Sequence, residues 1–350
     1  MTARPGRVRP ARLTDLPALG ELSRLSHASS SDERERSVRS LGLPVTASQV
    51  SVFSLFRMPL GAFQPHDPLY VYEEEGRLAG LARVERDDPR DEWTIVELDA
   101  IDRGAAGDIR FRMVQHLLRD GARRGAARFH VACADEGGNV ELFMQTGFAR
   151  YGEEAILHRA PGQRWPGLPR ESESGALRIR PAVPGDALQL SRLYWAVTPK
   201  PVARLEGYRL QDWERHGAHL RIPRSSLTPI LRFADLHGYV QECPPNTAPE
   251  LAAFMQVGVA KEDQPHYLRV VCRPEHDPSD LIRFGLAVIG DRSRDSHPNA
   301  LGVLSAVRTY ESPLDRRLEE VEFRVIATVS LLLKETLVRV AEPALVPAIR

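Results

Sequence analysis

A short glycine-rich segment is the part of this 350-residue chain best suited to chemistry. The segment is Arg103–Asp108, which reads RGAAGD and stands between a predicted strand and a predicted amphipathic helix. A turn that opens a helix offers free backbone N–H groups at the positive end of the helix dipole, and both features favour a bound phosphate. The alternative is a plain helix-capping turn in which the Asp108 carboxylate satisfies these amides, because Asp is a preferred N-cap residue.

The hydrophobic pattern around this segment predicts the elements that would position it. Alternating apolar residues predict strands, and apolar residues at helical spacing predict helices. The predicted strands cover residues 7–11, 69–74, 78–86, 93–101, 128–134 and 151–157, and the predicted helices cover 109–124 and 140–146. The apolar segment Val50–Leu60 is expected to pack on the core or to line a substrate groove. The apolar run Val325–Val338 is interpreted as a pair of core strands.

The chain contains an internal repeat. Arg178–Ala182 reads RIRPA and repeats Arg7–Ala11, which reads RVRPA. Further matches follow in the same order. Ile282-Arg283-Phe284 corresponds to Ile109-Arg110-Phe111, and Phe323 corresponds to Phe148. Residues 161–176 are rich in Pro, Gly, Ser and charge, as linkers are. The repeat predicts two similar domains, at residues 1–160 and 177–350, joined by this linker.

The order of elements from Glu92 to Phe148 resembles the core of the GNAT superfamily of acyl-CoA N-acyltransferases. It runs strand, glycine-rich turn, helix, strand, and short helix ending in Gly-Phe. The resemblance implies an α/β (α+β) fold with two GNAT-like domains, each a mixed, mostly antiparallel sheet flanked by helices. It also implies acetyl-CoA as a co-substrate, lying between the fourth and fifth strands, and an amine of a small molecule or peptide as the acceptor.

The resemblance also assigns residues to the cofactor. The family motif is Arg/Gln-x-x-Gly-x-Gly/Ala, from which this chain departs at Ala106 and Asp108. Asn139 corresponds to an asparagine that often contacts the pantetheine arm, and its alternative role is that of a helix N-cap. The implied cofactor-binding residues are Leu98, Ala100, Arg103, Gly104, Ala105, Ala106, Gly107, Asp108 and Asn139.

Catalysis in this family asks for a proton acceptor and often for a tyrosine that protonates the departing thiolate. Glu92 and Glu97 are the candidate bases, and each competes with the interpretation of a solvated carboxylate. The family tyrosine stands in a stretch such as L-Y-x-x-x-G-F, whereas this chain reads LFMQTGF and has Phe143 there. Tyr151 is the nearby candidate for the missing acid, and its alternative is a surface position on a strand. Glu85 and Asp99 are further alternatives for the base.

The second copy departs further from the family pattern. Its corresponding turn, Arg273–Asp280, has no glycine, and its two prolines remove N–H donors. Leu318 stands at the tyrosine position. We therefore expect this copy to be structural or to cover the substrate cleft of the first. For the whole protein two hypotheses remain, an N-acetyltransferase and a catalytically inactive acyl-CoA sensor or scaffold.

Composition excludes several other classes. The formal net charge is zero, with 47 acidic and 47 basic residues, which argues against nucleic acid as the main partner. The N-terminal residues lack the apolar region of a signal peptide, and no apolar run is long enough to span a bilayer. The three cysteines form no CxxC pair, which is typical of free thiols in a reducing cytoplasm, and no metal site is expected.

Overall fold

The computed structural model describes most of the chain. The described residues are 6–19, 22, 68–101, 106–135, 138–167, 179–215, 222–231, 233–243, 250–260, 264–293, 301–311 and 313–336. The sequence interpretation of Val50–Leu60 lies outside these ranges, and so do Arg103, Gly104 and Ala105 of the glycine-rich turn.

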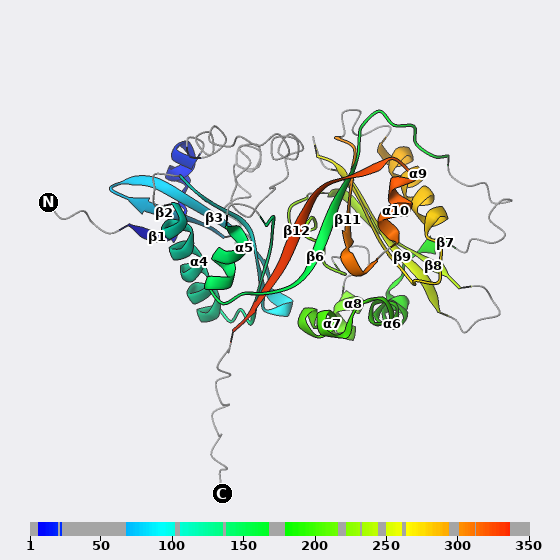
Figure 1. The fold of residues 1–350 in the computed structure, drawn as a ribbon, viewed down its shortest axis with the longest axis horizontal. Coiled ribbons are helices and arrows are strands. Elements are labelled where there is room, and N and C mark those ends of the chain that lie inside the picture. Colours follow the sequence, from blue (N-terminus) through cyan, green and yellow to red (C-terminus); the bar gives the residue numbers. More distant parts are fainter. Residues whose placement is uncertain are drawn as a thin grey trace, which may run out of the picture.

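The described strands form one continuous sheet that runs through the whole molecule (Figure 1). The strands of the N-terminal half are β1 Arg7–Pro10, β2 Leu69–Glu74, β3 Arg77–Asp87, β4 Glu92–Ala100, β5 Arg128–Cys133 and β6 Ala149–Arg159. Those of the C-terminal half are β7 Ile179–Pro181, β8 Phe233–Glu242, β9 Leu251–Ala260, β10 His266–Cys272, β11 Val303–Arg308 and β12 Phe323–Glu335. The order across the sheet is β1-β2-β3-β4-β5-β12-β6-β11-β10-β9-β8-β7.

Helices flank the sheet in both halves (Figure 1). In the first half the described helices include α4 Ala106–Arg123 and α5 Asn139–Gln145. In the second half they are α6 Ala187–Val197, α7 Lys200–Glu206, α8 Leu210–Arg215, α9 Ser279–Ser293 and α10 Leu314–Glu319. Helix α4 buries Met113, Val114 and Leu117 against the sheet, so its apolar stripe has helical spacing.

The two halves have the same strand order, which confirms the predicted fold class. Adjacent strands pair antiparallel except at β4–β5 and β10–β11, which are parallel and occupy equivalent places. The RVRPA repeat carries equivalent contacts as well. Arg9 binds Asp15 through two hydrogen bonds, of 2.7 and 2.9 Å, and reaches Glu73 at 2.6 Å. The second half repeats this set with Arg180, Asp186 and Glu242.

The last strand of each half is inserted into the sheet of the other half. Strand β12 lies between β5 and β6, and β6 lies between β12 and β11. The side chains follow this exchange, because Leu332 of β12 is fully buried in the core of the first half and Leu157 of β6 in the core of the second. Figure 1 shows β6 and β12 running side by side between the two lobes.

The prediction of two core strands over Val325–Val338 is wrong. Strand β12 is one continuous strand, Phe323–Glu335, with two register shifts against β6. The run contains no Gly, Pro, Asn or Asp, so it lacks the residues that most favour a tight turn between two strands. Its buried residues Leu331, Leu332 and Leu333 lie where the strand pairs with β5 and β6.

The strand exchange predicts that a cavity in β12 destabilises the first half. Leu332→Ala removes a fully buried side chain from that core and should lower the free energy of unfolding by about 2–5 kcal/mol. Hydrogen exchange should accelerate in peptides that cover β4 and β5. Val325→Ala, in the same strand but 42% exposed, is the matched control and should change stability by less than about 0.5 kcal/mol. Unchanged exchange in β4 and β5 would contradict the shared core.

Candidate functional site

Strands β4 and β5 separate partway along their length. They pair in parallel only where Glu92–Ile95 faces Arg128–Val131, whereas β4 stays paired with β3 as far as Ala100. The register between β3 and β4 shifts by one residue at Val96, which is the signature of a β-bulge. The bulge lies where the pairing with β5 ends. Beyond it, the edge of β4 that faces β5 is not paired with that strand.

The direction of the backbone amides along this edge can be followed from one hydrogen bond. The Ile101 amide donates to the Ala79 carbonyl of β3 at 3.0 Å. Because successive amides of a strand point to opposite edges, those of Leu98 and Ala100 face away from β3. The Ala100 amide donates to Asp99 Oδ1 at 2.7 Å. Among the described residues this leaves the Leu98 amide as the donor suited to a ligand carbonyl.

Helix α4 starts close beyond the end of β4, at the glycine-rich turn. Its first two residues are Ala106 and Gly107, so Asp108 lies inside the first turn instead of preceding the helix. The interpretation of Asp108 as an N-cap is therefore wrong. Its exposed carboxylate forms an ion pair with Arg112 at 2.8 Å, one turn further along. A carboxylate in the first turn competes electrostatically with any phosphate bound at that helix end.

Helix α5 starts beyond the end of β5, and Asn139 is its first residue. The N-cap is Gly138, in the left-handed conformation with φ of 72°, so the N-cap interpretation of Asn139 is wrong. The Asn139 side chain is 3% exposed. Its Oδ1 accepts a hydrogen bond of 3.0 Å from Arg110 Nη1 on α4. The two helix starts are thus joined beside the place where β4 and β5 separate.

Phe143, at the position of the family tyrosine, is held in the core. It is 1% exposed and packs edge-on against Phe148 with ring centroids 5.3 Å apart. Tyr151 lies on β6, separated from β4 by β5 and β12. Burial raises the pKa of Tyr151 to about 12, and its ring faces the Arg308 guanidinium of the second half at 6.0 Å. The structure therefore does not bring Tyr151 to the open edge of β4.

The two candidate bases differ in their surroundings. Glu97 stands beside Leu98 in β4, is 2% exposed, and accepts a hydrogen bond from Arg83 Nε at 3.0 Å. Glu92 lies at the opposite end of β4 and is 1% exposed. Burial by itself would raise the pKa of Glu92, but the charge of Arg224 and hydrogen bonds from neighbouring groups outweigh it and hold that pKa well below its usual range. A carboxylate with so low a pKa is a weak base.

Glu92 is the first-half centre of a buried ion cluster that joins the halves. Arg90 donates to Glu92 Oε1 at 2.8 Å and to the Glu206 carbonyl of the second half at 2.7 Å. Arg224 of the second half donates to Glu92 Oε2 at 2.8 Å and to Thr94 at 2.8 Å. The cluster comprises the carboxylates of Glu92, Glu154, Glu206, Asp212 and Glu311 and the guanidinium groups of Arg90, Arg128, Arg224, Arg269 and Arg308.

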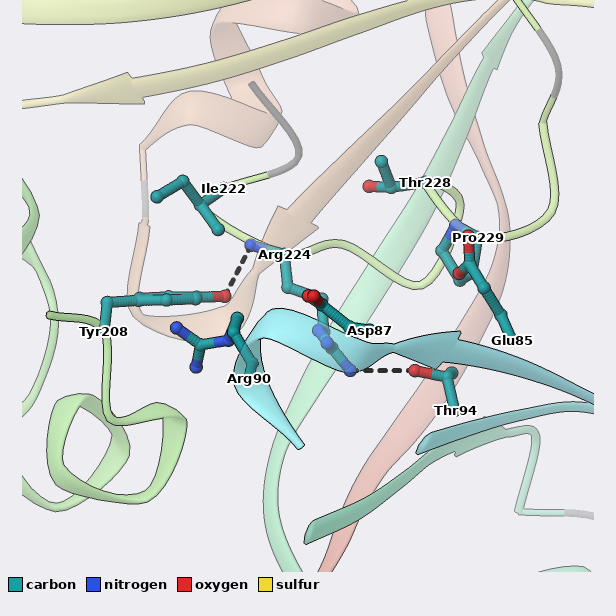
Figure 2. Close-up of a pocket in the computed structure, with 9 residues that line it drawn as sticks. All are labelled: Glu85, Asp87, Arg90, Thr94, Tyr208, Ile222, Arg224, Thr228 and Pro229. Atoms are coloured by element: carbon teal, nitrogen blue, oxygen red, sulfur yellow. Dashed lines mark hydrogen bonds between the residues drawn. The ribbon is translucent and has the colours of Figure 1, made fainter. Parts of the chain in front are cut away.

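A cavity of about 30 Å³ adjoins this cluster (Figure 2). Figure 2 shows Arg224 between the Tyr208 hydroxyl, which accepts from the Arg224 amide at 2.8 Å, and Thr94. The remaining lining residues are Glu85, Asp87, Arg90, Ile222, Thr228 and Pro229. This volume holds about two water molecules, so it is too small for a coenzyme.

The corresponding helix end in the second half is occupied by its own side chain. Asp277 Oδ1 accepts hydrogen bonds from the Ser279 amide at 3.0 Å and from the Ser279 hydroxyl at 2.6 Å, at the start of α9. Cys272 Sγ donates to the His276 carbonyl at 3.4 Å within the same turn. A carboxylate therefore already fills the place that a phosphate would take.

The described part of the chain has neither a membrane-spanning helix nor a cluster of metal ligands. None of its helices combines the length and the apolarity that crossing a bilayer requires. Within the same ranges, no group of three or more His, Cys, Asp or Glu side chains is arranged to hold a metal ion.

The sequence matches no protein-family model and no curated protein sequence. Solved structures do match. A tandem GNAT protein from the clavulanic acid biosynthesis pathway, without acetyl-CoA, has a TM-score of 0.55 at 13% identity, covering 95% of this chain and 98% of that one. A GCN5-related N-acetyltransferase from Sphaerobacter thermophilus has a TM-score of 0.57 at 13% identity, covering 94% and 95%. At these identities the likeness shows the fold alone, and it agrees with the predicted fold class of two GNAT-like halves, each a mostly antiparallel sheet flanked by helices.

The ion cluster leads to a prediction about acid stability. His130 Nε2 lies 3.4 Å from Glu92 Oε2. Burial and the charge of Arg224 lower the pKa of His130 to about 4, although Glu92 opposes this. The unfolded chain binds a proton below about pH 6.5 and the folded chain does not until about pH 4. Stability should therefore fall with pH through this window, by up to about 1.4 kcal/mol per pH unit.

Urea unfolding from pH 8 to 5 tests this. Wild type should lose about 2 kcal/mol between pH 6.5 and 5, and His130→Gln should abolish most of that loss because Gln does not titrate. His116→Gln is the control. His116 is half-buried on α4, with its pKa also lowered chiefly by burial, so its removal should change the profile less. A profile that His130→Gln leaves unchanged would show that the pKa of His130 is the same in the folded and the unfolded chain, which contradicts the prediction.

Proposed function

We propose that this protein is an N-acetyltransferase-like protein that binds acetyl-CoA at the open edge of β4 in its first half. The separation of β4 and β5 carries the proposal, because it leaves the Leu98 amide facing an edge with no paired strand. An extended pantetheine arm fits such an edge, and an amide aimed at a thioester carbonyl stabilises the oxyanion that forms there. The similar solved structures named above, both GNAT proteins, support the same assignment.

The remaining cofactor contacts follow from the start of α4. The backbone amides of Gly104, Ala105, Ala106 and Gly107 are proposed to hold the pyrophosphate, with Arg103 as a nearby cation. Ala100 is the neighbouring edge position, although its amide donates to Asp99. Asn139 is proposed to contact the pantetheine arm. Asp108 opposes the phosphates and weakens the site.

The acceptor is proposed to be a primary amine of a small molecule or peptide. Glu97 is the better placed of the two candidate bases, because it adjoins Leu98, whereas Glu92 is enclosed by arginines at the other end of β4. No acid stands at position 143 to protonate the thiolate, and Tyr151 lies on a distant strand. These two observations favour a second candidate function, that of a non-catalytic acyl-CoA sensor.

Calorimetric titration of the whole protein with acetyl-CoA tests the binding proposal. Asp108→Asn removes a negative charge from the first turn of α4 and should tighten binding about two- to fivefold. Asp280→Asn, in the first turn of α9 of the second half, is the matched control and should leave the affinity unchanged. If wild type and Asp108→Asn both fail to bind acetyl-CoA, the proposed function is wrong.

A thiol-release assay against a panel of amines separates the enzyme from the sensor. Phe143→Tyr restores a hydroxyl at the position of the family acid, and a positioned general acid is worth about 10²–10⁴-fold in rate. The gain should fall on turnover more than on affinity, because the thiolate forms only as the bond breaks. Phe148→Tyr, in the same pair of rings, is the control and should give no gain. If all variants bind acetyl-CoA and none releases thiol above the buffer rate, the sensor is favoured.

A further inference from the structure

The contact between Arg110 and Asn139 gives the open edge a feature that the sequence resemblance does not assign. We propose that Arg110 is a positioning residue, which fixes the Asn139 carboxamide so that it offers only N–H donors to a ligand. Asn139 then selects a ligand carbonyl, such as those of the pantetheine arm. This inference rests on the proposed acetyl-CoA site and names a residue that organises it.

The placement of the pair supports this role. Arg110 is in the first turns of α4, which follows β4, and Asn139 is the first residue of α5, which follows β5. Their hydrogen bond of 3.0 Å therefore bridges the two helices that start beyond the separating strand ends. A ligand that lies along the open edge of β4 and reaches the start of α4 passes beside this bridge.

The chemistry of the two side chains fixes the orientation of the amide. A guanidinium group has only donors, so it can bind the Asn139 side chain only through Oδ1. Rotating the carboxamide by half a turn would direct Nδ2 at Arg110 and place two donors against each other.

The donor side of the carboxamide is unused. Asn139 is 3% exposed, and within the described ranges its Nδ2 donates no hydrogen bond. Nδ2 is not sealed from solvent, so a ligand can reach it. An acceptor from a ligand would complete the site, and the oriented amide excludes ligand groups that can only donate.

The second half lacks this pair, although it repeats the surrounding elements. Helix α10 starts with Leu314 where α5 starts with Asn139, and leucine has no hydrogen-bonding group. Arg283, which answers Arg110 in the sequence repeat, is exposed on α9. Strand β10 also separates from β11, with which it pairs only over His266–Leu268, so the open edge occurs in both halves and the described side-chain bridge occurs in the first.

The test is a double-mutant cycle on the whole protein, read by calorimetry with three probes. The probes are acetyl-CoA, S-acetylpantetheine and 3′,5′-ADP, which carry the whole cofactor, its amide arm and its phosphate end. Arg110→Ala and Asn139→Leu should each weaken acetyl-CoA and S-acetylpantetheine about three- to tenfold and leave 3′,5′-ADP unchanged. The double variant should be no weaker than either single variant, because both remove the same contact.

Two further variants sharpen the test. Asn139→Asp keeps an acceptor for Arg110 but removes the N–H donors, so it should fold as wild type does and still lose the affinity that Asn139→Leu loses. Arg283→Ala is the matched control in the second half and should change nothing. Thermal unfolding of each variant checks that the fold is kept.

The outcomes separate this inference from the proposed function. If wild type binds acetyl-CoA but the losses of Arg110→Ala and Asn139→Leu add, the two residues act independently and the inference is overturned. The same holds if Arg110→Ala weakens 3′,5′-ADP, since Arg110 would then contact phosphate directly, or if Asn139→Asp binds as wild type does. If wild type binds neither acetyl-CoA nor S-acetylpantetheine, both the inference and the proposed function fail.

Discussion

The pairing of β6 with β12 is the constraint on which the rest of this structure depends. Each strand ends one half of the chain and completes the sheet of the other half, so neither half has a full sheet without its partner. Leu332 enters the first core and Leu157 the second, which makes the two cores share their closing strands. Lys334 of β12 also donates to the Thr146 carbonyl at the end of α5, at 2.8 Å. A cation at a helix C-terminus is favourable, so the second half stabilises a helix that borders the proposed site.

The exchange also brings charged side chains of the two halves together, and these buried charges pair with one another in the ion cluster. Its carboxylates and guanidinium groups are equal in number, so formal charges cancel while His130 is neutral. Removing ions from water is costly, and their mutual attraction compensates only when the geometry is close. Hydrogen bonds from Arg90 and Arg308 to main-chain carbonyls use donors that the carboxylates leave over.

The halves share one topology and differ at the helix starts, where a coenzyme would bind. In the first half β4 has a bulge and an open edge, and Arg110 holds Asn139 beside it. In the second half Asp277 caps the start of α9, and Leu314 stands in the place of the asparagine. A duplicated fold can thus keep its architecture in both copies, since the architecture depends on burial, while the side-chain contacts at the described helix starts differ between the copies.

The sequence alone determined most of the elements and the duplication. Alternation and helical spacing report burial within one strand or helix, and the RVRPA repeat predicted two similar halves. The structure shows the same strand order in both, and it adds an arginine-centred contact in each that the sequence analysis did not predict. Only the tertiary structure decided which strands became partners. The apolar run that forms β12 has the same pattern whether it folds on itself or inserts beside β5, because periodicity does not encode the neighbour. The sequence could not predict the environment of Glu92 either. Arg224, which binds it, lies 132 residues away in the chain, and a local pattern carries no signal of such a contact.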